Sequence, residues 1–152
     1  MRLTRRFIVK SLDNISLSNP IRYERYYINN KLRVQKKDNY YEKEILDEQN
    51  ILLEKSAIKE EEFLKLKSIS SSKIVRDSYL YLGNNNISIK KYYGDYEGLN
   101  RAEVKFLSKE EMDLYCREEW MGEEITFSPL AFDKDLSKLS REEFLKELKK
   151  YL

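Results

Sequence analysis

The 152-residue sequence contains no histidine, one cysteine, four glycines and two prolines. The absence of histidine excludes Ser-His-Asp and Cys-His catalysis and the usual zinc sites. Four glycines are too few for a glycine-rich phosphate loop, so any phosphate site must be built from lysine and arginine side chains. The single cysteine, Cys116, excludes an internal disulfide and indicates a reducing compartment. Because the first residues also lack the apolar region of a signal peptide, we expect a cytoplasmic protein.

Long apolar runs are also missing, since no stretch approaches the roughly 18 residues that a membrane helix needs. We therefore expect no membrane partner. Charge is abundant but nearly balanced, with 29 Lys+Arg against 27 Asp+Glu and a net charge of +2. This total identifies no partner, so the positions of the charges must carry the functional argument. No linker divides the chain, and we expect a single domain over residues 1–152.

Alternation of apolar and polar residues, typical of half-buried strands, recurs along most of the chain. We expect strands near residues 2–10, 21–28, 31–35, 40–46, 52–54, 73–81, 87–93 and 102–106. Asn29-Asn30 and the segment 83–86 are hairpin signals. Helices are expected at 58–66, 108–117 and 140–150, and the last two open with capping-box patterns at Ser108 and Ser140. The pattern predicts an α+β fold with six to eight antiparallel strands and flanking helices.

Two segments in the C-terminal part carry a resemblance to a known family. Residues 98–111 read GLNRAEVKFLSKEE, and residues 120–126 read WMGEEIT. Their order and spacing resemble the signature of the CYTH family, which belongs to the triphosphate tunnel metalloenzymes. That group includes adenylyl cyclases, thiamine-triphosphatases and tripolyphosphatases. The resemblance implies an eight-stranded antiparallel β-barrel or tunnel, in which alternate residues of each strand face the lumen.

The resemblance also implies which residues would face a ligand. Arg6, Arg33 and Arg76 stand where the family has basic residues, and Lys43 is a looser basic candidate on the strand that follows Arg33. The family has acids where this chain has Arg2, Thr4, Ser88, Lys90 and Lys105, while Glu103 is retained. The predicted ligand-binding set is therefore Arg6, Arg33, Lys43, Arg76, Lys90, Lys105 and Glu103, with Tyr26 placed to stack on a base.

This replacement of acids has a chemical consequence. Family chemistry resembles two-metal phosphoryl transfer, in which carboxylates hold Mg²⁺ or Mn²⁺ and basic side chains clamp the triphosphate. A lumen rich in cations repels a divalent metal but suits an anion, because arginine binds phosphate oxygens in a bidentate manner. We expect no cofactor and a protein that binds a nucleotide, a cyclic nucleotide or a triphosphate without metal-dependent turnover.

Other interpretations remain open at this point. An active triphosphatase or nucleotidyl cyclase would need Mg²⁺ or Mn²⁺ and acids from other strands. The candidate acids are Glu24, Glu42, Glu44, Glu54 and Glu103, and Glu124 is either a further lumen acid or a loop residue. A structural or protein-interaction module on the same fold is a third possibility. A nucleic-acid surface built from Arg5-Arg6 and Lys36-Lys37 is less favoured.

Overall fold

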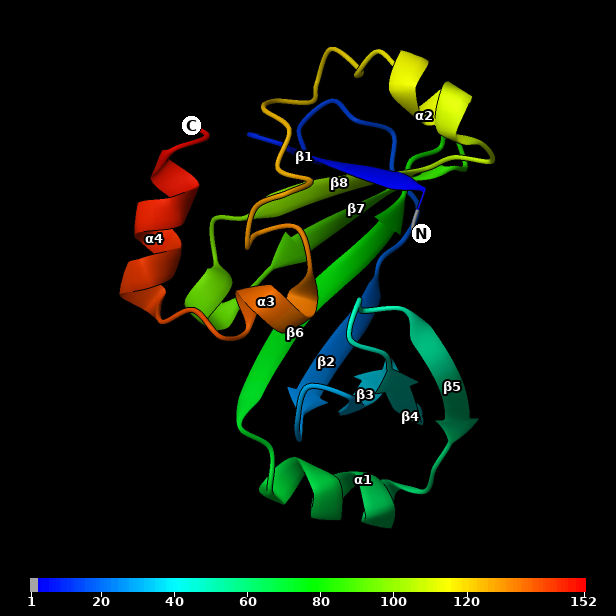
Figure 1. The fold of residues 1–152 in the computed structure, drawn as a ribbon, viewed down its shortest axis with the longest axis vertical. Coiled ribbons are helices and arrows are strands. Elements are labelled where there is room, and N and C mark those ends of the chain that lie inside the picture. The colour runs from blue at the N-terminus through cyan, green and yellow to red at the C-terminus, as the bar shows by residue number, and fades with distance from the viewer. Residues whose placement is uncertain (1–2) are drawn as a thin grey trace.

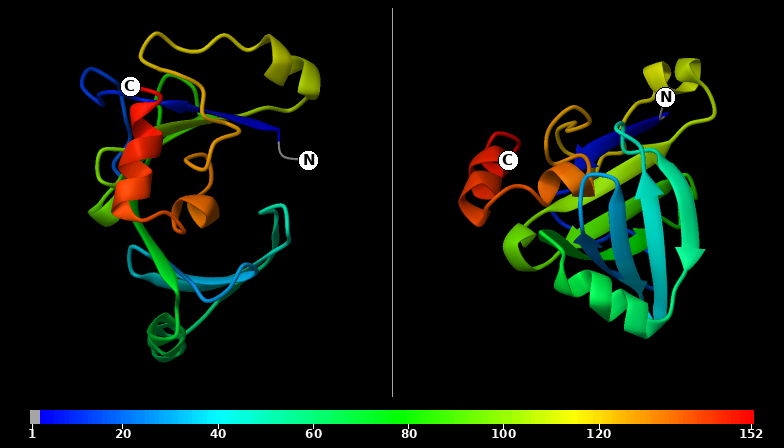
Figure 2. Two further views of the ribbon diagram at one scale, coloured as in Figure 1. Left: turned by 60° about the vertical axis from the view of Figure 1, so that its left-hand side comes forward. Right: turned by 60° about the horizontal axis from the view of Figure 1, so that its bottom comes forward.

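The computed structural model describes residues 3–152, in which eight strands form one antiparallel sheet. The strands are β1 (Thr4–Ile8), β2 (Ile21–Tyr27), β3 (Leu32–Lys37), β4 (Tyr40–Leu46), β5 (Leu52–Ala57), β6 (Ser72–Leu80), β7 (Ile87–Tyr92) and β8 (Asn100–Lys105). Their order across the sheet is β1-β8-β7-β6-β2-β3-β4-β5 (Figure 1). Figure 2 shows the sheet curving into an open C, because the edge strands β1 and β5 do not pair with each other. The predicted antiparallel fold is confirmed as an open barrel.

The free edge of β1 is covered by the segment 122–126 rather than by β5. Ile8 N–H donates to the Glu123 carbonyl at 2.9 Å, and Ile125 N–H donates to the Arg6 carbonyl at 2.8 Å. The N–H of Gly122 donates to the Ile8 carbonyl at 2.6 Å. A Cβ at position 122 would lie 3.2 Å from that carbonyl oxygen, so glycine permits the close approach. The C-terminal third of the chain is thereby held against the first strand.

Four α-helices and one short 3₁₀ segment complete the fold. They are α1 (Glu60–Ser68), the 3₁₀ turn η1 (Gly94–Tyr96), α2 (Lys109–Leu114), α3 (Asp133–Leu136) and α4 (Arg141–Lys149). The side chains of Ser108 and Ser140 accept hydrogen bonds at the starts of α2 and α4, as the capping patterns predict. The expected helix over 108–117 is shorter in the structure, and η1 and α3 were not expected. None of the helices within residues 3–152 is both long and apolar enough to cross a membrane.

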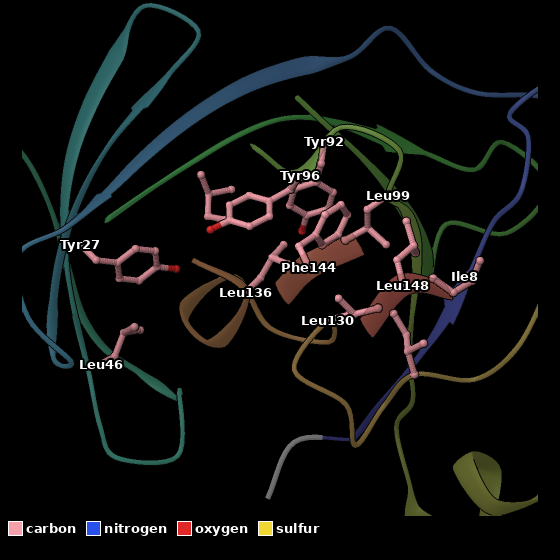
Figure 3. Close-up of a cluster of buried hydrophobic side chains, with 12 residues drawn as sticks. Ile8, Tyr27, Leu46, Tyr92, Tyr96, Leu99, Leu130, Leu136, Phe144 and Leu148 are labelled. Carbon is pink, nitrogen blue, oxygen red and sulfur yellow. The ribbon is translucent and has the colours of Figure 1, made fainter. Parts of the chain in front are cut away.

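Three apolar clusters cover parts of the two faces of the sheet. On the convex face, α1 covers Tyr26 and Val34, and a second cluster packs behind β1, β7 and β8. On the concave face, α3, α4 and the segment leading to them cover one end of the sheet. Figure 3 shows this third cluster, in which Phe144 and Leu148 of α4 meet strand residues such as Tyr92. The rest of the concave face is polar and holds the candidate site.

Residues 1–2 lie outside the described part of the chain, so the prediction for Arg2 has no structural counterpart.

Candidate functional site

The concave face of the sheet contains a cavity of about 650 Å³, which we call the basic cavity. Its basic lining residues are Arg6, Arg25, Arg33, Arg76, Lys90, Arg101, Lys105 and Lys134. Glu103 and Asp133 are the two acidic residues in its lining. Six members of the set predicted from the sequence line this one cavity: Arg6, Arg33, Arg76, Lys90, Lys105 and Glu103.

Strand register explains why these side chains meet. Within each strand alternate residues share a face, so Glu103 and Lys105 of β8 point the same way. Arg6 of β1 pairs with Glu103, and Lys90 of β7 pairs with Arg101. Paired residues on neighbouring strands point to the same side of the sheet, so all of these side chains share one face. The alternation that is visible in the sequence is therefore sufficient to gather basic residues from strands far apart in the chain.

Tyr26 and Lys43 do not reach the cavity. Both are paired with Val34 in the sheet, and all three side chains face the convex side. The ring of Tyr26 packs on Phe63 of α1 at 5.8 Å, and Lys43 Nζ lies 3.5 Å from the Glu62 carboxylate of that helix. The prediction that they bind the ligand is therefore wrong for this cavity, because the hairpin register places both side chains on the face opposite to Arg33.

The other acids considered for a metal site also lie outside the cavity lining. Glu44 forms a buried ion pair with Arg33 at 2.9 Å, and Glu124 pairs with Arg5 at 2.7 Å on the convex side of β1. The remaining three do not line the cavity: Glu24, Glu42 and Glu54. Because Arg5 and Arg6 point to opposite faces, they do not form one surface patch.

Arg25, Arg101, Lys134 and Asp133 line the cavity but were not identified in the sequence. A signal for Arg101 existed, since it precedes Glu103 by two residues on one strand and must share its face. The same argument applies to Arg25. It lies two residues before Tyr27 on β2, and Tyr27 pairs with Arg33, so Arg25 and Arg33 share a face. Lys134 and Asp133 had no signal, because they lie in a segment without strand alternation.

Asp133 is the most highly connected acid in the cavity. Arg25 Nη1 and Arg76 Nε donate to its Oδ2 at 2.8 and 2.9 Å. Arg101 Nη2 and the Tyr92 hydroxyl donate to its Oδ1 at 3.1 and 2.5 Å. Burial by itself would raise the pKa of Asp133, but the three guanidinium groups outweigh it and hold the pKa well below its ordinary value. This carboxylate is therefore charged and saturated with donors.

Lys90 and Glu103 form a second, weaker group. Glu103 Oε2 lies 3.7 Å from Lys90 Nζ, and its Oε1 lies 3.4 Å from Arg6 Nη2. Burial lowers the pKa of the Lys90 ammonium to about 7; Glu103 opposes this shift, and the charges of Arg76 and Arg101 add to it. Burial therefore disfavours the charged form of Lys90, and Glu103 offsets only part of this effect.

The donor set does not fit the Mg²⁺ or Mn²⁺ that the family resemblance implies. Among residues 3–152 there is no group of three or more His, Cys, Asp or Glu side chains close enough to hold a metal. Both carboxylates that line the cavity are already paired with basic side chains. Hard divalent cations need several oxygen ligands, preferably anionic ones, and these residues do not supply them.

The depressed pKa of Lys90 predicts a pH dependence of stability. Between about pH 7 and about pH 10.4, the unfolded chain keeps the Lys90 proton that the folded chain has released. The free energy of unfolding should therefore rise with pH, by about 2 kcal/mol from pH 7 to pH 9, relative to Lys90→Met. Urea denaturation of both proteins at the two pH values measures this difference. Lys91→Met, on the opposite face of β7, should keep the wild-type pH dependence; identical pH profiles for wild type and Lys90→Met would contradict the assignment.

Comparison with known proteins gives a match at the level of structure. No family model matches the sequence, and no curated protein matches it. A solved structure described as the hypothetical protein NE1496 has a TM-score of 0.75 and 18% identity, covering 92% of this chain and 99% of that one. A second, described as the inorganic triphosphatase NE1496, has a TM-score of 0.73 and 19% identity, covering 90% and 94%. At such low identity the likeness establishes the fold alone, and the fold is the one that the sequence resemblance implies. The chain therefore has the CYTH-like fold of the triphosphate tunnel proteins.

Proposed function

We propose that this protein binds a phosphorylated anion, such as a nucleotide, a cyclic nucleotide or a triphosphate, in the basic cavity and without a divalent metal. The observation that carries the proposal is the charge of the cavity, where eight basic side chains face two acidic ones. Most of these cations are buried, and the carboxylates of Asp133, Glu103 and Glu44 offset only part of their charge. A buried charge that stays uncompensated costs several kcal/mol. An anionic ligand is the natural compensation.

The chemistry of the lining favours phosphate over other anions. Arginine offers a planar fork of donors that matches phosphate oxygens, and five of the eight basic residues are arginines. Arg101 uses two of its nitrogens on Asp133 and the Leu130 carbonyl. Its Nε is buried and has no acceptor among the described residues. Lys105 is exposed at the rim, where it can meet an incoming anion.

The replacement of acids in the lining supports binding without turnover. Thr4, Ser88, Lys90 and Lys105 stand where the family resemblance puts acids, and Ser88 and both lysines line the cavity. The structural neighbour described as an inorganic triphosphatase is the reason to retain hydrolysis as the second candidate. That candidate requires a metal site, and it predicts release of phosphate from tripolyphosphate on addition of Mg²⁺ or Mn²⁺.

A thermal-shift experiment with tripolyphosphate and excess EDTA tests the proposal. A ligand at about 100 times its Kd stabilises the folded state by about 2.7 kcal/mol. For a domain of this size that corresponds to an increase in Tm of about 5–10 °C. The increase should shrink as salt is added, because screening weakens charge pairing.

The matched variants are Lys90→Gln and Lys91→Gln, since the two lysines are adjacent on β7 and face opposite sides of the sheet. We expect Lys90→Gln to lose most of the thermal shift and Lys91→Gln to retain it. A wild-type protein whose Tm is unchanged by tripolyphosphate, by a nucleoside triphosphate and by a cyclic nucleotide would refute the proposal. Phosphate release that depends on Mg²⁺ or Mn²⁺ would instead favour the enzyme.

A further inference from the structure

The concave face changes from basic to apolar along β1, β6, β7 and β8, in the direction of α3 and α4. On each of these strands, the residue two positions from a basic residue, on the side nearer α3 and α4, belongs to the apolar cluster of Figure 3. The pairs, basic residue first, are Arg6 and Ile8, Arg76 and Ile74, Lys90 and Tyr92, and Arg101 and Leu99. The basic cavity is therefore closed at this end by packed side chains, and a ligand must extend the other way, towards Ser88 and Lys105.

Asp133 lies at the boundary between these two regions. The strands β2, β6 and β8 each direct one guanidinium group at its carboxylate, and β7 directs the hydroxyl of Tyr92. Three guanidinium groups around one oxyanion form the arrangement that would also bind a terminal phosphate. The protein's own chain thus fills the anion position that is deepest in the cavity.

The segment that carries Asp133 is fixed in place. Leu130, Ala131 and Leu136, which flank it in sequence, have no measurable exposure, and Leu136 N–H donates to the Phe132 carbonyl at 2.9 Å. Lys134 Nζ donates to the Asn30 carbonyl at 3.2 Å, which ties the start of α3 to the β2–β3 hairpin. Displacement of Asp133 by a ligand would expose this apolar packing, so the carboxylate remains in the site when a ligand binds.

We infer that Asp133 is a fixed internal counter-anion that sets how far a phosphorylated ligand enters the basic cavity. The inference rests on the proposed function and specifies how deeply its ligand binds. The carboxylate of Asp133 accepts hydrogen bonds from Arg25, Arg76 and Arg101, and its negative charge repels a phosphate that approaches them. The basic residues left for the ligand are Arg6, Arg33, Lys90, Lys105 and Lys134, and Glu103 and Glu44 offset part of their charge. This number of cations suits two or three phosphate groups, and a longer chain gains little because its further units lie outside the mouth.

The test is isothermal titration of orthophosphate, pyrophosphate, tripolyphosphate and tetrapolyphosphate, with EDTA present. For the wild type we expect affinity to rise up to tripolyphosphate and to change less than threefold beyond it. Asp133→Asn removes the charge and releases three guanidinium groups to the ligand. It should bind tripolyphosphate and tetrapolyphosphate at least tenfold more tightly than the wild type, and its affinity should continue to rise from tripolyphosphate to tetrapolyphosphate, because the chain can enter further. Its affinity should also fall more steeply with salt, because more charges are paired with the ligand.

Two further variants keep the outcome interpretable. Asp135→Asn, two residues away on the same helix and half-buried, should bind the whole series like the wild type. Asp133→Glu keeps the charge, and it tests the inference even if Asp133→Asn does not fold. Its longer side chain moves the carboxylate further into the cavity, and we expect at least a fivefold loss for tripolyphosphate and little change for orthophosphate.

The results separate this inference from the function on which it rests. If the wild type binds none of the four anions, the proposed function fails. If the wild type binds them but affinity depends on chain length in the same way in the wild type and in the Asp133 variants, only the inference fails. A uniform loss of affinity across the series in both variants would show that Asp133 has a purely structural role, and would also overturn the inference.

Discussion

Replacing Glu44 by glutamine is expected to lower the free energy of unfolding by about 3 kcal/mol. Glu44 and Arg33 form an ion pair at 2.9 Å on the concave face of adjacent strands, with side chains that are 3% and 11% exposed. Removing one member of a buried pair leaves the other charge uncompensated, which typically costs about 3–5 kcal/mol. Urea denaturation at pH 7 measures the loss. Glu54→Gln, an exposed position on β5, is the control and should change stability by less than about 0.5 kcal/mol.

The double variant Glu44→Leu/Arg33→Met separates pairing from packing. Because both charges are then absent, it should recover most of the stability that Glu44→Gln loses. If the double variant loses as much free energy of unfolding as Glu44→Leu and Arg33→Met lose together, the two side chains do not interact and the expectation is wrong. Since Arg33 also lines the basic cavity, the same variant should bind tripolyphosphate more weakly than the wild type.

The ion pair also predicts a loss of stability in acid. Burial alone would raise the pKa of Glu44, but the charges of Arg33 and Arg25 outweigh it and hold the pKa below its ordinary value. A carboxylate whose folded pKa is depressed contributes stability above its unfolded pKa and loses it as the pH falls through the folded value. The difference in stability between wild type and Glu44→Gln should therefore shrink below about pH 4.

Phe144→Ala is expected to destabilise the protein by about 3–5 kcal/mol, because it removes a large side chain from a core that cannot fully collapse. Phe144 has no exposed surface, and its ring lies 5.4 Å from that of Tyr96 in an edge-to-face arrangement. It holds α4 against the cluster that closes the apolar end of the cavity (Figure 3). Chemical denaturation measures the effect. Leu145→Ala, the next residue and 45% exposed, should cost less than about 1 kcal/mol, and equal losses in the two variants would contradict the packing described here.

Much of the strand layout could be predicted from local patterns. The turn signals at Asn29-Asn30 and at residues 83–86 correspond to the β2–β3 and β6–β7 hairpins, and the expected strand at 40–46 matches β4. Side-chain alternation is a property of the extended backbone itself, so it survives whatever the strand packs against. This is why residues taken from five different strands met in one cavity.

Tyr26 and Lys43, predicted to bind the ligand, lie on the face opposite to Arg33 because of the register of the β2–β3 and β3–β4 hairpins. Arg33 pairs with Tyr27 and with Glu44, which fixes Tyr26 and Lys43 on the other face. A one-residue change in register reverses the face of every side chain, so a loose alignment is enough to produce this mistake. Arg25 and Arg101 could have been identified by the same rule.

The sequence by itself determined the α+β class, the strand order along the chain and the basic character of one sheet face, because each depends on residues close together in the chain. Only the tertiary structure decided how open the barrel is and what fills its closed end. Asp133 meets Arg25 and Arg76 across 108 and 57 residues of sequence. It lies in a segment whose composition gives no periodic signal, and its position depends on the packing of Leu130, Ala131 and Leu136 against the concave face. Contacts between residues so far apart in the sequence form because the whole chain buries its apolar surface, and no local sequence pattern specifies that burial.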